Sequence, residues 1–133
     1  TVDLSFNSLN ATFSISSLMG LKNLENVHMA ECLISSTIPE DFDALKSLIT
    51  IDFDSNFLSG TIPSSLGKIA SLEYILLGSN ALTGTIPSDL ALLQNLTVLE
   101  VQENSLTGVI PSEFGNMTKI SLFNYTGNEI SDS

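Results

Sequence analysis

Apolar residues recur along this chain with a period of 24 residues. Two consecutive copies, at 48–71 and 72–95, share the pattern Leu-x-x-Ile-x-Φ-x-x-Asn-x-Leu-x-Gly-x-Ile-Pro-x-x-Leu, where Φ is Phe or Leu. Alternation at the start of each copy predicts a short strand with its apolar side chains on one face. Self-similarity at such a period indicates a solenoid of stacked coils, in which these strands form one parallel sheet.

The same register extends to both sides of these two copies. It divides the single domain 1–133 into a partial coil 1–23, four coils at 24–47, 48–71, 72–95 and 96–119, and a partial coil 120–133. In the first coil the Gly and Ile-Pro positions hold other residues. Because both outer coils are partial and carry no polar caps, we expect a fragment of a longer chain or an uncapped subunit.

The repeat resembles the leucine-rich repeat, and its Leu-(Ser/Thr)-Gly-x-Ile-Pro segment is similar to the plant-type subclass of receptor-kinase ectodomains and polygalacturonase-inhibiting proteins. The resemblance covers essentially the whole chain. It implies an α/β repeat solenoid of about six right-handed coils, with the parallel sheet on the concave face and irregular or short helical turns on the convex side. Such repeats are scaffolds whose exposed positions decide the ligand.

One position of the repeat predicts a hydrogen-bonded column. At the corner after each strand a polar side chain is expected to turn inward and satisfy backbone groups of the neighbouring coil. The six members of this structural ladder are Asn7, Cys32, Asn56, Asn80, Asn104 and Asn128. Cys32 is the only cysteine, so the chain has no intrachain disulfide, and we interpret it as a small buried thiol.

Charge limits the possible partners. Four Lys and Arg against fifteen Asp and Glu give a formal net charge of -11, which disfavours nucleic acid and anionic lipid as partners. Partners steered by electrostatics should be basic. No apolar run approaches the roughly 18 residues that cross a bilayer, so we expect no membrane insertion by this segment, and no signal peptide begins it.

The residues between the inward positions of each strand should face outward on the concave side. There the sequence places acidic groups beside an aromatic and aliphatic patch, which suits a basic or amphipathic peptide with an aromatic anchor. The candidate ligand-binding residues are His28, Asp52, Asp54, Tyr74, Leu76 and Glu100. The alternative is that the acidic side chains only keep an exposed sheet soluble.

Enzyme chemistry, metal and cofactor binding are not expected. The carboxylates of Asp52 and Asp54 would lie on a flat sheet and would not converge on a calcium ion. His28, between Asp3 and Asp52, lacks a nucleophile and an oxyanion hole.

Four Asn-x-Thr sequons predict N-glycosylation at Asn10, Asn95, Asn116 and Asn124. The last falls in the central concave column, where a glycan would close that end of the surface to a large ligand. A line of threonines beside the Gly-x-Ile-Pro bends resembles the surface of ice-binding proteins, but Ser or Thr before the Gly belongs to the repeat itself.

These patterns favour an extracellular or cell-surface protein-interaction module, part of a receptor-like or inhibitor-like protein, that recognises a peptide or protein ligand. The alternative is a structural surface glycoprotein or a fibre subunit that associates head to tail through open solenoid ends.

Overall fold

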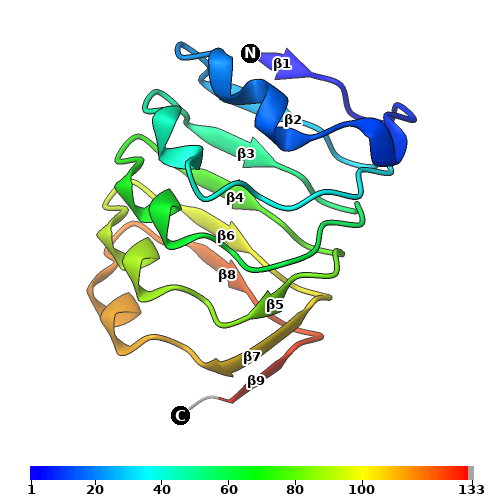
Figure 1. Cartoon of the computed structure of the whole chain (residues 1–133). Helices are drawn as coiled ribbons and strands as arrows, with labels where there is room; N and C mark the ends of the chain where they lie inside the picture. The colour runs from blue at the N-terminus through cyan, green and yellow to red at the C-terminus, as the bar shows by residue number, and fades with distance from the viewer. Residues whose placement is uncertain (132–133) are drawn as a thin grey trace.

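The computed structural model describes residues 1–131, which wind into a stack of coils with one strand of a six-stranded parallel sheet per coil (Figure 1). The strands lie in the order β1 (Val2–Asp3), β2 (Asn26–His28), β3 (Thr50–Asp52), β4 (Tyr74–Leu76), β6 (Val98–Glu100) and β8 (Leu122–Asn124). This confirms the α/β repeat solenoid. Among the residues described, no helix has the length and apolar character needed to cross a membrane.

The sheet register follows the repeat without a slip. Val27 pairs with Ile51, Ile51 with Ile75, and Ile75 with Leu99. These four side chains are fully or almost fully buried, whereas the residues on either side of them are mostly less buried. The predicted alternation of inward and outward residues is therefore correct, and it defines the columns of the concave face.

The core is one continuous stack of Leu, Ile, Val, Met and Phe side chains. Phe42 and Phe53 meet edge to face, with 6.1 Å between ring centroids. Near the last coil Phe114, Phe123 and Tyr125 form a second aromatic group, with centroids 5.4 and 5.0 Å apart. Because each coil buries its apolar side chains against its neighbours, stability depends on stacking.

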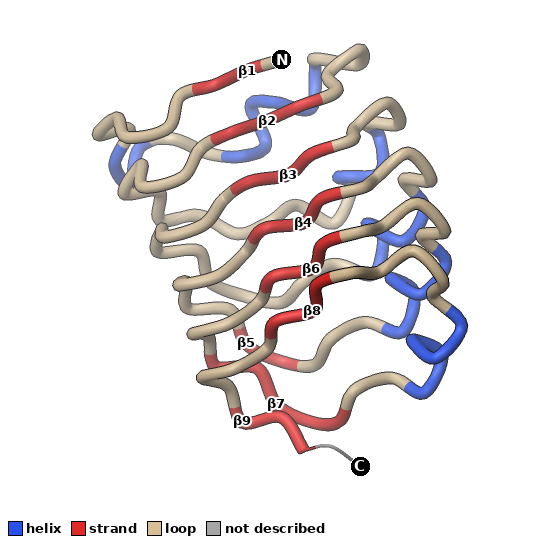
Figure 2. Tube along the Cα trace, turned by 180° about the vertical axis from the view of Figure 1, so that it is seen from behind, coloured by secondary structure: helices blue, strands red, loops and turns tan. Residues whose placement is uncertain are grey.

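Short 3-10 helical turns form the convex side, except the first, which lies at the opposite edge of the stack and is drawn in dark blue in Figure 1 (Figures 1 and 2). Three of them start directly after a proline, whose fixed φ ends the extended segment and leads into the turn. The turns are η1 (Asn10–Thr12), η2 (Ile15–Gly20), η3 (Phe42–Ala44), η4 (Ser64–Lys68), η5 (Ser88–Leu92) and η6 (Ser112–Asn116).

A second, three-stranded parallel sheet, which the sequence pattern did not predict, lies along one flank (Figure 2). It consists of β5 (Thr83–Gly84), β7 (Ser105–Val109) and β9 (Glu129–Ser131). Bridges between Thr37 and Ser59 and between Thr61 and Thr83 continue it toward the amino terminus. The threonine line therefore lies along a hydrogen-bonded flank.

Two features of this flank require glycine at Gly108. Its φ is +86°, and a β-carbon there would lie 2.9 Å from the Thr85 methyl of the preceding coil. The threonine methyl thus covers a backbone that has no side chain of its own.

The first coil is irregular, as expected, but it is well packed. Where the coils at 48–71, 72–95 and 96–119 carry Gly-x-Ile-Pro, it forms η1 and then the longer η2, from which Ile15 and Leu18 enter the core. Two helical turns thus replace one extended flank.

Candidate functional site

The central column of the concave face has one residue on each of the six rungs. Sheet pairing aligns them in the order Asp3, His28, Asp52, Leu76, Glu100 and Asn124. Adjacent rungs are about 4.8 Å apart. The column therefore has acidic residues near its amino-terminal end, an apolar residue at Leu76 and a further acidic residue at Glu100.

Asp52 is the most connected carboxylate of the column. Its Oδ2 lies 3.7 Å from Nδ1 of His28, and its Oδ1 accepts the backbone N–H of Asp54 at 3.2 Å. The His28 side chain is 35% exposed and that of Asp52 18% exposed. The His28 imidazole thus faces the Asp52 carboxylate across neighbouring rungs.

Asp3 uses the same local geometry at the first rung. Its Oδ1 accepts the backbone N–H of Ser5 at 3.1 Å. This hydrogen bond, assisted by the Ser5 hydroxyl and by nearby His28, lowers the pKa of Asp3 below its ordinary value of 3.8. The group stays ionised at physiological pH.

The fourth rung interrupts the acidic field. Tyr74 pairs with Thr50 and Val98, and Leu76 pairs with Asp52 and Glu100. Tyr74 is 39% exposed, so its ring is available to a partner. An aliphatic side chain thus lies between two carboxylates with an aromatic ring beside it on the same rung, which is the mixed surface that a peptide with basic and apolar residues requires.

Asp54 lies one rung below this patch, in the column two residues beyond the central one. Its Oδ2 accepts a hydrogen bond from the Ser55 hydroxyl at 2.7 Å. All six candidate ligand-binding residues lie on rungs two to five of one face, although Asp54 and His28 belong to different columns.

The side chains at the corner position connect each coil to the one before it. Asn80 Oδ1 accepts the Leu58 N–H at 2.9 Å, while its Nδ2 donates to the Phe53 carbonyl at 3.0 Å. Asn56, Asn104 and Asn128 repeat this pattern on their own preceding coils. Asn7, in the first coil, donates within its own corner, to Leu4 and Ser5 carbonyls.

Cys32 replaces Asn in this column and changes the backbone beside it. Its buried Sγ lies 3.0 Å from the Leu4 carbonyl and keeps the donor role of the amide. The acceptor role passes to the backbone carbonyl of Cys32, which receives the Leu9 N–H at 3.0 Å and the Asn10 N–H at 3.3 Å. Leu33 has a φ of +58°, a conformation that turns the intervening peptide toward the first coil.

A left-handed backbone conformation recurs at the residue before each corner, which sequence reasoning missed. Only the last of these positions is a glycine, so residue type did not reveal it. The six residues are Phe6, Glu31, Ser55, Ser79, Glu103 and Gly127, with φ between +52° and +67°.

The structure places the four sequons in different surroundings. Asn10 and Asn124 each accept the backbone N–H and the hydroxyl of the threonine two residues later. Asn116 is exposed at the end of η6. Asn95 is also exposed, but its Nδ2 donates to the Ala70 carbonyl and its Oδ1 accepts Lys119 Nζ at 2.7 Å.

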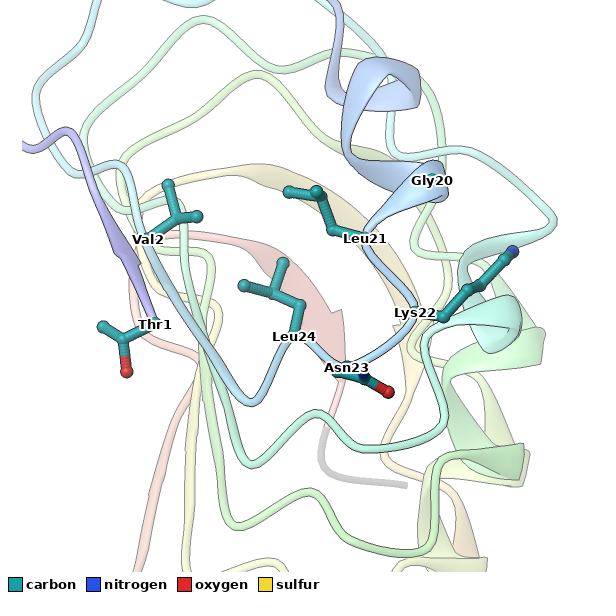
Figure 3. Close-up of a pocket in the computed structure, with 7 residues that line it drawn as sticks. All are labelled: Thr1, Val2, Gly20, Leu21, Lys22, Asn23 and Leu24. Atoms are coloured by element: carbon teal, nitrogen blue, oxygen red, sulfur yellow. The ribbon is translucent and has the colours of Figure 1, made fainter.

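Surface hollows occur away from the central column. One, of about 370 Å³, lies beside β1 and the end of η2, where the Val2, Leu21 and Leu24 side chains face a shared space and Lys22 points away (Figure 3). Another, of about 620 Å³, lies beside β7 between the Ile86-Pro87 and Val109 segments. Within residues 1–131, no three His, Cys, Asp or Glu side chains are grouped so that they could hold a metal ion.

Sequence comparison gives one match. The family model described as Leucine Rich Repeat matches residues 47–69, 71–93 and 95–117, just over half of the chain. A search of curated proteins found no match.

Structural comparison finds close likeness to plant receptor ectodomains. PEPR1 in complex with AtPEP1 superposes with a TM-score of 0.91 at 33% identity, covering 98% of this chain and 18% of that one. The Arabidopsis HAESA ectodomain, in complex with an extended IDA peptide hormone, gives 0.92 at 28% identity, covering 97% and 22%. The ectodomain of the receptor kinase SOBIR1 from Arabidopsis thaliana gives 0.89 at 27% identity, covering 97% and 70%. The chain thus spans about a fifth of the length of the first two proteins.

Proposed function

The chain belongs to the leucine-rich repeat family, of the plant type found in receptor-kinase ectodomains, and on this premise we propose that it is an extracellular module that binds a peptide through its concave face. The proposed site comprises His28, Asp52, Asp54, Tyr74, Leu76 and Glu100. A binding role, with no catalysis, is in keeping with receptor ectodomains of this fold.

The observation that carries the proposal is the composition of rungs three to five. Leu76 lies between Asp52 on one neighbouring rung and Glu100 on the other, and Tyr74, two residues earlier on the same rung, lies between Thr50 and Val98. A peptide laid across the strands could place an apolar residue on the fourth rung and basic residues on either side. The similar HAESA ectodomain is in complex with a peptide hormone, which supports a peptide as the kind of ligand.

The distribution of positive charge favours a basic or amphipathic peptide. The chain's four basic residues are Lys22, Lys46, Lys68 and Lys119, and all lie outside the strands of the large sheet. Lys68 pairs with Asp43 at 3.6 Å on the convex side. His28 is therefore the only side chain of the central column that can neutralise its carboxylates.

A displayed library of random peptides, selected on the purified 133-residue protein, tests the proposal. We expect selected peptides to combine an aromatic or aliphatic residue with Lys or Arg. Tyr74→Ala and the triple variant Asp52→Asn, Asp54→Asn, Glu100→Gln should each weaken binding, measured by calorimetry, by about tenfold or more.

A matched charge control is available on the convex side. The triple variant Asp41→Asn, Asp89→Asn, Glu113→Gln removes the same charge from exposed positions outside the large sheet. It should leave affinity within about twofold, apart from a small change in long-range steering. Equal losses in both triple variants would mean that net charge alone attracts the peptides, and the concave site would be rejected.

The extracellular location is tested through the sequons. We expect glycans on at least some of Asn10, Asn95, Asn116 and Asn124 when the chain is isolated from its source, identified by mass spectrometry of glycopeptides. A glycan on Asn124 would restrict ligands to the rungs nearer the amino terminus, because this residue pairs with Glu100 in the central column. Protein isolated wholly without glycans would contradict the assignment to the secretory route.

A second candidate function, self-association, is favoured by the apolar hollow beside β1. Leu21 is 46% exposed there, next to Val2 and Leu24. A second copy could cover these side chains, as could a further coil. Light scattering of the 133-residue protein over a range of concentrations tests self-association. A molar mass that rises with concentration in the wild type, and not in Leu21→Ser, would support it.

A further inference from the structure

One rung of the concave face has no side chain where its neighbours carry long polar ones. Gly78 lies between Asp54 and Gln102, as the backbone bonds from Ser55 N to the Gly78 carbonyl and from Ser79 N to the Gln102 carbonyl show. A β-carbon on Gly78 would be 2.6 Å from Asp54 Oδ1 and less than 3.0 Å from Gln102 Nε2. Both side chains therefore lean over the buried glycine and fill the space that its own side chain would take; the arrangement of Asp54, Gly78 and Gln102 is called the notch below.

The notch has two acceptors with nothing to accept. Asp54 Oδ1 and Gln102 Oε1 are buried, and neither has a hydrogen-bond partner among residues 1–131. The other atom of each group is engaged, because Asp54 Oδ2 accepts from the Ser55 hydroxyl and Gln102 Nε2 lies 3.5 Å from Glu100 Oε2. Buried acceptors without donors are rare in folded proteins, so this pair is available to a donor from outside the chain.

The charge around the notch selects the kind of donor. Asp54 belongs to the notch, and Glu100 contacts Gln102 from the central column. The four lysines lie outside the large sheet. A positively charged donor would gain from both carboxylates, whereas a neutral donor would satisfy only the hydrogen bonds.

The rest of the fourth rung provides a path for an aliphatic stem. Tyr74, Leu76 and Gly78 alternate along one rung and face the same side, about 6.6 Å apart. A long basic side chain could lie on Leu76 and place its charged end over Gly78. An aromatic residue, an aliphatic residue and a glycine covered only by flexible side chains thus occur in sequence on a single rung.

We propose that the Asp54 and Gln102 side chains turn aside from Gly78 and together receive the charged end of a lysine or arginine side chain of the ligand. This inference rests on the proposed function, since it identifies which part of a peptide the concave face holds. It predicts where the basic group lies: along the fourth rung, two steps of about 6.6 Å from the ligand residue that packs on Tyr74.

The variant Gly78→Ala places a methyl group where the Asp54 and Gln102 side-chain ends now meet, and should leave the fold intact. The φ of Gly78 is outside the left-handed region, and the atoms that its new methyl would meet are ends of flexible side chains. Gly115→Ala is the matched control, because a β-carbon there has no heavy atom within 4 Å. Unchanged cross-peaks for residues away from the notch would confirm that both variants fold.

The first measurement is a titration of the ¹⁵N-labelled protein, followed by NMR, with N-acetyl-arginine amide and N-acetyl-lysine amide. We expect shifts of the Gly78 backbone amide and the Gln102 side-chain amide. N-acetyl-citrulline amide, which has the shape of arginine without its charge, should not cause them, and neither cationic probe should cause them in Gly78→Ala. Leucine amide, with a free amino group, tests the other source of an ammonium.

The second measurement uses peptides selected on the wild type. Their affinity should fall by about tenfold or more in Gly78→Ala and stay unchanged in Gly115→Ala. Absence of shifts with the cationic probes, or equal shifts with citrulline, would overturn the inference and mean that Asp54 and Gln102 close on each other across Gly78. A response to leucine amide alone would overturn the side-chain assignment in favour of a peptide amino terminus.

The two proposals can fail separately. Selected peptides that bind the concave face without requiring Lys or Arg would overturn the notch and leave the proposed function in place. Failure to select any peptide would count against the proposed function, while the amino-acid probes would still report on the notch.

Discussion

The carbonyl oxygen of Asp89 lies against the α-carbon of Gly67, where η5 packs on η4 of the preceding coil, and a β-carbon on Gly67 would be less than 3.0 Å from it. We therefore expect Gly67→Ala to destabilise the protein by about 1–3 kcal/mol, because backbone must move. Gly115→Ala, in the equivalent turn of a later coil, should stabilise by about 0.5–1 kcal/mol, since its methyl meets nothing. Urea unfolding measures both; equal effects would refute the close contact.

Leu33 provides a test of the backbone change at Cys32. Its side chain is 48% exposed and its φ is +58°, so Leu33→Gly should relieve strain and stabilise by about 1 kcal/mol. Phe57 is the equivalent residue of the next coil and has an ordinary negative φ. Phe57→Gly should destabilise by about 0.5–1 kcal/mol. A loss of stability in both variants would show that Leu33 is not strained.

Removing the hydrogen bonds of Asn80 should be among the most destabilising single changes in the chain. Asn80→Ala removes the acceptor of the Leu58 N–H and a donor to the Phe53 carbonyl, and should cost about 2–4 kcal/mol. Hydrogen exchange should show reduced protection of Leu58, in the coil before the substitution. The exposed Asn23 serves as the control, with an expected change below about 0.5 kcal/mol. Unchanged protection of Leu58 would contradict the bond.

Asp3 should titrate below its ordinary pKa of 3.8 in the folded protein, followed by NMR of its carboxyl carbon. Because the folded value is lowered, ionised Asp3 contributes stability above its ordinary pKa, and that contribution is lost as the pH falls through the folded pKa. Ser5→Ala removes the hydroxyl but keeps the backbone N–H, so the pKa should rise part of the way back. An ordinary value in the wild type would refute the bond from the Ser5 N–H.

Much of the fold was predictable because one period carries two signals. The 24-residue repeat fixes which residues align, and the alternation within it decides which face outward, so the pairing of Asp52 with His28 and Leu76 follows from counting. The flank sheet was missed because β5 and β7 consist largely of Thr, Ser and Gly, which lack an apolar alternation.

The candidate site was only partly predictable. The 24-residue period places Asp54, Gly78 and Gln102 in one column, but it does not indicate which way the flexible side chains turn. Gly78 carried no signal of its own, and only the buried, unpaired oxygens beside it reveal a notch. The backbone change at Cys32 was also hidden, since it compensates for a missing amide by rotating a peptide at Leu33. Whether the six candidate residues bind a ligand remains a prediction.

The corner side chains also have a consequence for the order in which the chain folds during synthesis. Each ladder asparagine after the first coil completes the hydrogen bonds of the coil that precedes it, as Asn80 does for Leu58. The backbone groups at the corner of a newly synthesised coil therefore obtain their hydrogen bonds only when the asparagine of the next coil is in place. During synthesis we therefore expect the newest coil of the stack to keep an incomplete corner until the following asparagine has been made.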